Sequence, residues 1–464
     1  MSNPGDQDVT PIASGPGLTA QLAAHLALGF KPRGEWRIGT EHEKFGFRRA
    51  DLLPPPYEPD GIEAVLEGIE RSSAGLWSPI HDNTHLIGLK GSGQHAGGSV
   101  SLEPAGQFEL SGAPLVSLHE TEAEMAAHFA AVNAVAGPMG LGFAPLGFQP
   151  TMTRAQMPWM PKSRYAIMRR YMAEVGTLGL DMMQRTCTVQ VNLDYGSESD
   201  MRRKLQVSLA LQPVATALFA NSPFREGKPN GLLSGRAHVW TDTDNARAGM
   251  LPLFFEEDFG FERFVEWVLD VPMYFVSRDG ILIDAAGLSF RRWLDGREPR
   301  LAGVVPTLGD FDDHLTTVFT DVRLKRFLEM RGADAGSPAM MAAQSALWVG
   351  LLYDDAALTA ARALVGTHRW TDYIALRGHV PRQGLSAAWG SGTLRDLARD
   401  MLAIASDGLR ARGMKDASGT DERRYLEPLQ VIVEGGPTQA EHWLERYHGV
   451  WQGDASRIWA EAEI

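Results

Sequence analysis

The segment from Thr186 to Tyr195 alternates between apolar and polar side chains, and this pattern restricts the fold more than any other in the chain. A period of two is typical of a β-strand with one face in a core. Such strands occur in antiparallel sheets, whose second face is either open to water or lines a polar cleft. Cys187, Val189, Val191 and Leu193 are expected in the core, and Thr186, Thr188, Gln190, Asn192 and Asp194 on the polar face.

Two glutamates, Glu41 and Glu43, lie two residues apart within a predicted strand over residues 36–48. Residues at this spacing point to the same face of a strand, where two like charges favour a shared counterion. The alternative is a solvated strand edge that carries ordinary surface glutamates.

Glu103 and Glu109 repeat this theme on two further predicted strands, residues 99–103 and 107–111. Pro104, Ala105 and Gly106 between them favour a tight turn, which would bring both carboxylates close together. Oxygen ligands without paired His or Cys suit Mg²⁺ or Mn²⁺ better than zinc, and Mg²⁺ commonly binds together with nucleotide phosphates. The four glutamates therefore predict a metal site formed on strands.

Composition excludes several classes of protein. The chain has 464 residues, of which 44% are hydrophobic, and a net charge of −13. A strongly acidic chain is a poor ligand for nucleic acid or an anionic membrane, so neither is expected as a partner. No apolar segment is long enough for a membrane span, and a cytoplasmic location is predicted. The single cysteine, Cys187, excludes an intrachain disulfide and a cysteine-based zinc site.

The chain is predicted to form a flexible tail over residues 1–16 and a single catalytic domain over residues 17–464, with a mainly helical region over 339–464. Helices are also expected over residues 18–28, 61–72 and 115–139, and helical structure over residues 320–332.

Arginines in the middle of the chain are candidates for binding anions. Arg236 and Arg247 follow turn-rich loops, and a guanidinium group can bind a carboxylate or phosphate in a bidentate geometry. Arg323, Arg326 and Glu329 have the three-residue spacing of one helical stripe. Ordinary surface charges, including a solvated helix face with internal ion pairs, explain the same patterns.

Eight motifs in order resemble the glutamate–cysteine ligase family, in its plant-type and proteobacterial branch within the glutamine-synthetase-like carboxylate–amine ligases. The motifs span most of residues 36–355, but the stretch Gly91–Gly98 is longer than the usual hairpin and the second cysteines of plant members are absent. The matching segments are Ile38–Phe47, Ser101–Pro114, Arg185–Asp194, Ala220–Phe224, Gly227–Gly231, Val239–Asp244, Asp270–Phe275 and Val322–Asp334.

The resemblance implies ATP-dependent joining of the γ-carboxylate of L-glutamate to the amine of L-cysteine through γ-glutamyl phosphate, the first step of glutathione synthesis. It implies an α+β fold in which a curved antiparallel sheet forms the floor of the active site and helices pack outside. Mg²⁺ or Mn²⁺ would be the metal ion and ATP the co-substrate.

The resemblance also suggests roles for individual residues. Glu41, Glu43, Glu103, Glu109 and Glu329 would bind the metal, the last by analogy with the superfamily. Arg323 and Arg326 would contact the transferred phosphoryl group as catalytic residues. The expected substrate-binding residues are Arg164, Arg185, Gln190, Asn192, Arg236, Arg247, Tyr274 and Trp348.

Other functions are compatible with the same residues. The acceptor amine could differ from cysteine, since no sequence pattern identifies what recognises the thiol. A metal-dependent phosphohydrolase would use the same carboxylates with water as the acceptor, and a non-catalytic protein would only bind glutamate or ATP. The sequence leaves monomer and homodimer open.

Overall fold

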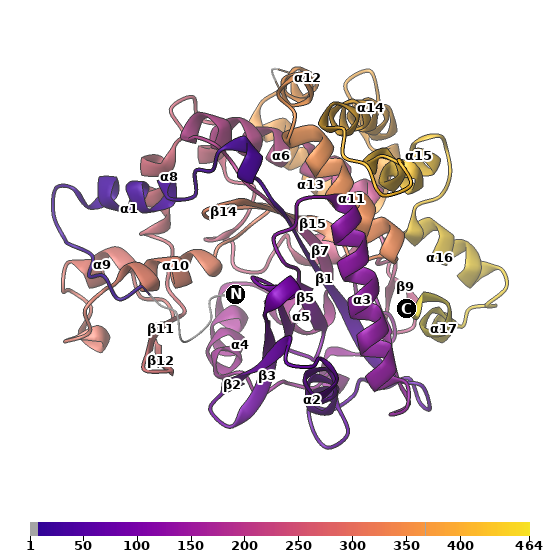
Figure 1. Cartoon of the computed structure of the whole chain (residues 1–464), viewed down its shortest axis with the longest axis horizontal. Coiled ribbons are helices and arrows are strands. Elements are labelled where there is room, and N and C mark those ends of the chain that lie inside the picture. Colours follow the sequence, from indigo (N-terminus) through magenta and orange to yellow (C-terminus); the bar gives the residue numbers. More distant parts are fainter. Residues whose placement is uncertain (1–7, 367) are drawn as a thin grey trace.

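A computed structural model describes residues 8–366 and 368–464, and one antiparallel sheet organises it (Figure 1). The strand order is β14-β15-β7-β1-β5-β4-β3-β2, and β6 pairs with the second half of β1. The strands are β1 (Ile38–Arg48), β2 (Trp77–Asp82), β3 (His85–Gly91), β4 (Ser99–Leu102), β5 (Phe108–Ser111), β6 (Leu141–Ala144), β7 (Thr188–Leu193), β14 (Val322–Leu324) and β15 (Leu328–Asp334).

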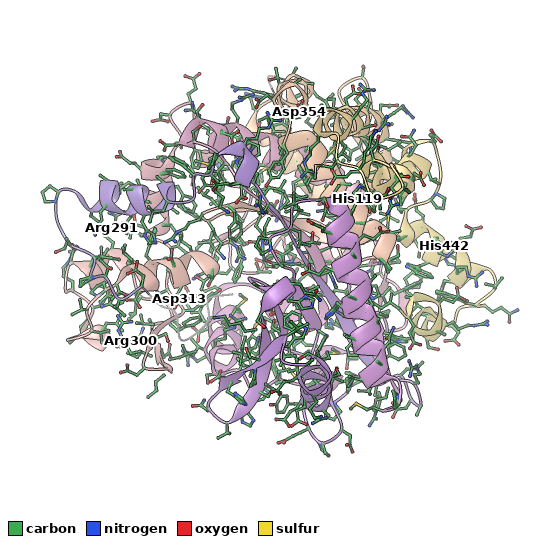
Figure 2. All side chains as sticks on the ribbon, in the orientation of Figure 1. His119, Arg291, Arg300, Asp313, Asp354 and His442 are labelled. Atoms are coloured by element: carbon green, nitrogen blue, oxygen red, sulfur yellow. The ribbon has the colours of Figure 1, made fainter. Side chains whose placement is uncertain are left out.

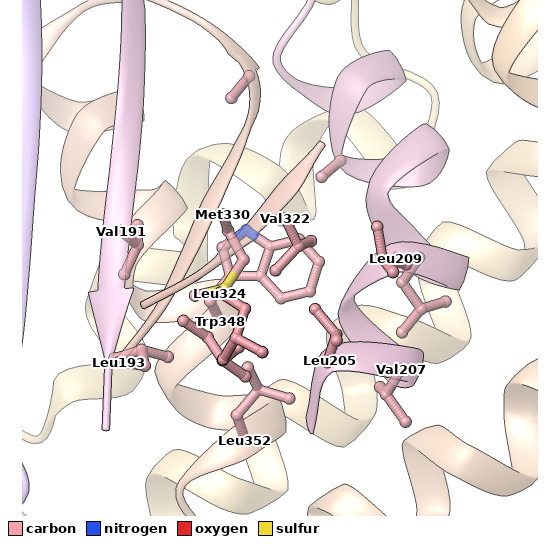
Figure 3. Packing of buried hydrophobic residues seen from close by; sticks show 14 of the residues in the cluster. Val191, Leu193, Leu205, Val207, Leu209, Val322, Leu324, Met330, Trp348 and Leu352 are labelled. Carbon is pink, nitrogen blue, oxygen red and sulfur yellow. The ribbon is translucent and has the colours of Figure 1, made fainter. Parts of the chain in front are cut away.

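Helices cover the apolar face of this sheet. α11 (Pro338–Leu352) packs on β7, α6 (Glu198–Leu218) on β15, and α3 (Leu118–Ala136) on β1. Val191 and Leu193 of β7 lie in the same core as Trp348 of α11 (Figure 3). The predicted α+β fold, with an antiparallel sheet and helices packed outside it, is confirmed.

The opposite, polar face of the sheet is bordered by smaller elements. These are α4 (Ser163–Val175), α10 (Leu308–Thr316) and the hairpin of β11 (Phe275–Arg278) and β12 (Ile281–Asp284). Figure 1 shows α10, β11 and β12 together on one side of the molecule, away from α3 and α11.

The remaining elements complete the helical layers. The other helices are α1 (Leu18–Ala27), α2 (Ile62–Ser72), α5 (Gly179–Arg185), α7 (Gly235–Val239), α8 (Phe261–Val268), α9 (Phe290–Leu294), α12 (Asp355–Val365), α13 (Trp370–Gln383), α14 (Leu394–Arg412), α15 (Glu427–Val433), α16 (Gln439–His448) and α17 (Ile458–Ala462). The short strands are β8 (Phe224–Arg225), β9 (Lys228–Pro229), β10 (Ala248–Gly249), β13 (Phe319–Thr320), β16 (Ala388–Trp389) and β17 (Gly392–Thr393).

The prediction of helical structure over residues 320–332 is wrong, because this segment forms the hairpin of β14 and β15. Arg323 lies directly opposite Glu329 across the hairpin, so the two side chains meet as a cross-strand pair. Their separation in sequence also fits one face of a helix, and charge spacing alone did not distinguish the two geometries.

The segment predicted as a flexible tail is partly attached to the fold. Residues 1–7 lie outside the described residues, but Pro11 pairs with Thr307 and the side chain of Ile12 is buried. The division into a tail and a single domain over residues 17–464 stays a prediction. Among the described residues, no helix combines the length and apolar character that crossing a bilayer requires.

Candidate active site

A cleft of about 860 Å³ lies over the polar face of the sheet. Figure 2 labels Asp313 of α10, one of the residues that line it. Glu41 of β1 and Asn192 of β7 form part of its floor. Its walls carry a concentration of basic side chains, namely Lys31, Arg37, Lys90, Lys162, Arg164, Lys325 and Arg326. The same lining includes six carboxylates, those of Glu41, Asp82, Asp194, Asp279, Asp312 and Asp313, so its charges nearly balance. In a chain of net charge −13, this cleft therefore offers cationic side chains to an anionic ligand within a mixed-charge lining.

The strand register places the predicted glutamates and amides on one face. Glu43 lies directly opposite Glu109 of β5, and Glu41 lies directly opposite Gln190 of β7. Asn192 lies opposite Glu329 of β15. Directly opposed residues share a face of the sheet. Glu41, Glu43 and Glu109 therefore share one face, and their predicted roles as metal ligands stay predictions.

Alternation along β1 separates this polar face from the helix-covered one. Thr40, between Gly39 and Glu41, hydrogen-bonds Ser345 of α11 at 2.8 Å. Lys44, next to Glu43, reaches His128 of α3 at 2.8 Å. The glutamates therefore point away from these helices.

Burial and mutual repulsion oppose the ionisation of three of these glutamates. Burial raises the pKa of Glu43 well above its usual value, and Glu103 and Glu109 raise it further. The pKa of Glu41 is raised by burial, then by Glu329 and Glu109. The pKa of Glu109 is raised by burial, then by Glu103. Among the described residues, none of these three carboxylates forms an ion pair.

Hydrogen bonds hold these carboxylates in place. Glu41 accepts one from Asn192 Nδ2 at 2.8 Å, and Glu43 accepts one from the Thr188 backbone N–H at 2.9 Å. Glu109 accepts from the hydroxyl of Ser111 at 2.6 Å. Neutral donors orient a carboxylate without cancelling its charge.

The carboxylates fit a hard divalent cation, since added positive charge would favour their ionised forms. Within the described part of the chain, no three His, Cys, Asp or Glu side chains already converge as a metal cage. Mg²⁺ typically binds through one or two carboxylates plus substrate phosphates. Separate glutamates on one face of the sheet, with Glu41 in the lining of the cleft, suit that mode better than a closed protein cage.

Glu329 differs from the other glutamates because two arginines neutralise it. Arg323 forms two hydrogen bonds to its carboxylate, one of them at 2.8 Å, and Arg331 forms another at 2.9 Å. Burial alone would raise the pKa of Glu329, but Arg323 and Arg331 lower it to about 2. Its predicted role as a metal ligand stays a prediction, and the structure shows it as the anion of a buried ion-pair network.

Two of the predicted arginines line the cleft. Arg164 at the start of α4 lies 3.8 Å from Glu103, and Arg326 lies 3.3 Å from Asp312. Lys162 and Lys325 also line the cleft and were not predicted as site residues. Each lies within two residues of a predicted arginine, and this proximity in sequence was the available signal.

A second, smaller cavity of about 30 Å³ lies beside β15, between α6, α7 and α13. Arg236 and Arg331 line it together with Trp240 and Gln212. The Nη2 of Arg236 donates to the Arg331 carbonyl at 2.8 Å, while its buried Nε has no partner among the described residues. The space equals that of about two waters, which is also that of the two oxygens of one carboxylate.

Five predicted substrate-binding residues line neither cavity, namely Arg185, Gln190, Arg247, Tyr274 and Trp348. Gln190 accepts a hydrogen bond from Arg331 Nη1 beside Glu329. Arg185 is buried in an ion pair with Asp181 at 2.8 Å. Arg247 pairs with Asp244 at 2.6 Å and stacks on the ring of Tyr274 at 3.8 Å, so these two form one buried cluster.

Trp348 is fully buried between α6 and the apolar face of the sheet (Figure 3). These placements favour structural roles for Arg185, Arg247, Tyr274 and Trp348. Cys187 is buried too, in agreement with the packing role expected for it.

Comparison with solved structures identifies the class of fold. The chain resembles a glutamate–cysteine ligase from Francisella tularensis in complex with AMP, with a TM-score of 0.52 and 12% sequence identity, over 93% of this chain and 89% of that one. At this identity the likeness establishes the fold alone, which is that of a glutamate–cysteine ligase.

Sequence comparison then identifies the family. Residues 37–461 match the model of glutamate-cysteine ligase family 2. The chain is 50% identical over 453 residues to the chloroplastic glutamate–cysteine ligase of Solanum lycopersicum, covering 97% of this chain and 83% of that protein. It is 50% identical over 450 residues to that of Arabidopsis thaliana, covering 97% and 84%. The chain therefore belongs to the glutamate–cysteine ligase family.

The predicted enzyme class is thereby confirmed. The general reaction of this family is ATP-dependent ligation, and it forms the first step of glutathione synthesis. The predicted cytoplasmic location is contradicted, because these relatives are named as chloroplastic enzymes. The absence of a long apolar segment does not distinguish the cytoplasm from the interior of an organelle.

Proposed function

We propose that the chain joins L-glutamate to L-cysteine through γ-glutamyl phosphate, in the cleft over the polar face of the sheet. The observation that carries this proposal is the group of buried glutamates with raised pKa values on one face of the sheet, of which Glu41 lines the cleft together with seven lysines and arginines. Such a site suits phosphoryl transfer, which needs alignment and charge neutralisation more than a nucleophilic side chain.

The reaction consists of two displacements. An oxygen of the glutamate γ-carboxylate forms a bond to the γ-phosphorus of ATP, and the bond to the bridging oxygen breaks with its electron pair remaining on ADP. The amine of cysteine then attacks the activated carbonyl carbon, phosphate leaves with the electrons of the carbon–oxygen bond, and the amine loses a proton.

The residues of the chain have distinct roles in this scheme. Arg164 and Arg326 bind anionic groups in the cleft, and Asn192 orients polar groups on its floor. Gln190 holds Arg331 beside Glu329 and so supports that floor. Arg236 binds the carboxylate of an amino-acid substrate in the smaller cavity. Arg323 keeps Glu329 ionised and in place, and thereby supports the floor of the site.

Glu41, Glu43, Glu103 and Glu109 would hold Mg²⁺ or Mn²⁺, and Glu329 is the remaining candidate ligand. When bound, such an ion neutralises phosphate charge and aligns the phosphoryl group. The raised pKa values of Glu41, Glu43 and Glu109 support this assignment, because a cation would relieve their repulsion.

The first experiment measures ADP release by purified protein with Mg-ATP and L-glutamate, with and without L-cysteine, and identifies the product by mass spectrometry. We expect release that depends on cysteine and a product with the mass of γ-glutamylcysteine. Release only with another amine would change the acceptor, release without any amine would identify a hydrolase, and ATP binding without turnover would identify a binding protein.

A further inference from the structure

Lys162 lies at the N-terminal end of α4 and lines the cleft, although its side chain is 6% exposed. Its ammonium group donates a hydrogen bond to the carbonyl of Leu102, at the end of β4, at 2.6 Å. The ring of Tyr165 lies 5.7 Å away and provides a cation–π contact. The nitrogen is therefore held at a fixed point in the wall next to Glu103.

The ammonium of Lys162 has unused hydrogen-bonding capacity. It carries three N–H donors, and the Leu102 carbonyl accepts one of them. Within the described part of the chain it forms no ion pair with a carboxylate. Burial, followed by Arg164, lowers its pKa to about 8, against the opposing effect of Glu103 and Glu109. Lys162 is thus still mainly charged near neutral pH, in a site that lacks a paired anion.

The other buried lysines are satisfied by the fold. Among the described residues, the other two buried lysines are Lys44 and Lys204. Lys204 pairs with Asp200 at 2.9 Å and lies 3.5 Å from the centre of the Trp36 ring. Lys44 points to α3 on the opposite face of the sheet, where it bonds His128. Neither lines the cleft, so packing explains them without a ligand.

We propose that Lys162 is a catalytic residue that binds the transferred phosphoryl group of ATP through its two remaining N–H donors. This inference rests on the ligase function proposed above. As the bond between the γ-phosphorus and the bridging oxygen breaks, its electron pair goes to ADP and the phosphorus bonds to the glutamate carboxylate. Lys162 neither gains nor loses a proton, and its charge offsets that of the phosphoryl oxygens.

The test compares Lys162→Met and Lys162→Arg with the wild-type protein. Catalytic rates are measured as cysteine-dependent ADP release. Calorimetry gives the affinities for Mg-ADP and for a non-hydrolysable ATP analogue with an imido group between the β- and γ-phosphates. We expect Lys162→Met to lower kcat at least about 100-fold, the usual effect of removing one donor to a transition-state oxyanion. The same substitution should lower the affinity for the analogue about 10-fold and the affinity for ADP less than about 2-fold, because only the analogue carries the terminal phosphate. Lys162→Arg should recover part of both losses.

Lys204→Met is the matched control, since it removes a buried lysine from outside the cleft. It should lower the melting temperature and leave the ratio of analogue to ADP affinity unchanged. If Lys162→Met does not fold, the wild-type protein is labelled with an amine-specific reagent, and Lys162 should be protected by the analogue and not by ADP. Equal effects on ADP and analogue, or kcat within about 3-fold of wild type, would overturn the inference. Wild-type protein that forms no γ-glutamylcysteine would instead overturn the proposed function.

Discussion

At the scale of single residues, Glu43 is a buried carboxylate whose ionisation its surroundings oppose. Burial, Glu103 and Glu109 raise the pKa of Glu43, so the folded state holds its proton at pH values where the unfolded chain, with a glutamate pKa of about 4.3, has lost it. The stability contributed at this site therefore falls as pH rises from the unfolded pKa towards the folded one. A cation would offset that loss.

Glu43→Gln removes the unfavourable buried charge at this position, and we expect it to stabilise the protein when divalent ions are absent. Its melting temperature should exceed that of the wild type at pH 8 in EDTA, and the difference should shrink towards pH 4.5. Thermal melts across this range measure the effect, with the exposed Glu67→Gln as the control. A difference that does not change with pH would contradict the assignment, and Mg²⁺ should stabilise the wild type more than the variant.

Glu41→Gln and Glu103→Gln test the metal assignment directly. Each substitution keeps the shape of the side chain and removes its charge, so ADP formation should fall at least about 100-fold while the protein stays folded. Coupled assays of ADP release and circular dichroism measure both quantities. Glu445→Gln, on an exposed part of α16, is the control. Near-normal turnover in both cleft variants would refute the assignment.

Arg323→Met tests the buried ion-pair network. The substitution leaves the buried carboxylate of Glu329 with Arg331 alone, and removing one member of a buried pair typically destabilises by about 3–5 kcal/mol. Urea unfolding measures this change in the free energy of unfolding. Arg326→Met removes an arginine with a side chain 42% exposed and should cost under about 1 kcal/mol. Similar effects in both variants would argue against a special role for the network.

At the scale of elements, the sequence predicted strands well where alternation or turn chemistry was strong. The alternation of residues 186–195 corresponds to β7, and the turn at residues 104–106 joins β4 to β5 as expected. The hairpin of β14 and β15 was missed because Arg323 and Glu329 have a spacing that also suits a helix. Strand order, which creates the site, depends on contacts between distant segments and had no local signal.

Close packing of α11 on α14 provides a test at this scale. A Cβ on Gly350 would lie 2.3 Å from the Ala405 carbonyl, whereas one on Gly378 in α13 would meet nothing within 4 Å. Gly350→Ala should lower the free energy of unfolding by about 1–3 kcal/mol through overpacking. Gly378→Ala should raise it by about 0.5–1 kcal/mol, because alanine favours helices. Chemical denaturation measures both changes in the free energy of unfolding. If the two substitutions changed it in the same direction, the close packing of α11 on α14 would be contradicted.

At the scale of the whole molecule, α17 and the residues that follow it pack on β1 and β6, which come much earlier in the sequence. Phe47 of β1 packs on Trp459 of α17 with ring centroids 4.9 Å apart, and the Ile464 N–H donates to the Phe143 carbonyl of β6 at 3.0 Å. β1 also carries Glu41 and Glu43. The integrity of the site therefore depends on the last helix.

Trp459→Ala should lower the free energy of unfolding by about 3–5 kcal/mol, the usual effect of truncating a buried aromatic side chain. Because the loss affects β1, ligase activity should disappear in the same temperature range as the far-UV circular dichroism signal. Val450→Ala, at a position 58% exposed, is the control and should be nearly neutral. Activity that survives unfolding of the C-terminal helices would show that the two regions are independent.

The strand order of the sheet has a consequence for the order of synthesis. β1 leaves the ribosome early, but β7 follows about 140 residues later and β15 nearly 300 residues later, and these supply Gln190, Asn192 and Glu329. A nascent chain thus carries the acidic strand and its neighbour β5 long before β7 and β15 exist. It cannot assemble the cleft until β15 has been made, so catalytic competence arises only after that strand joins the sheet.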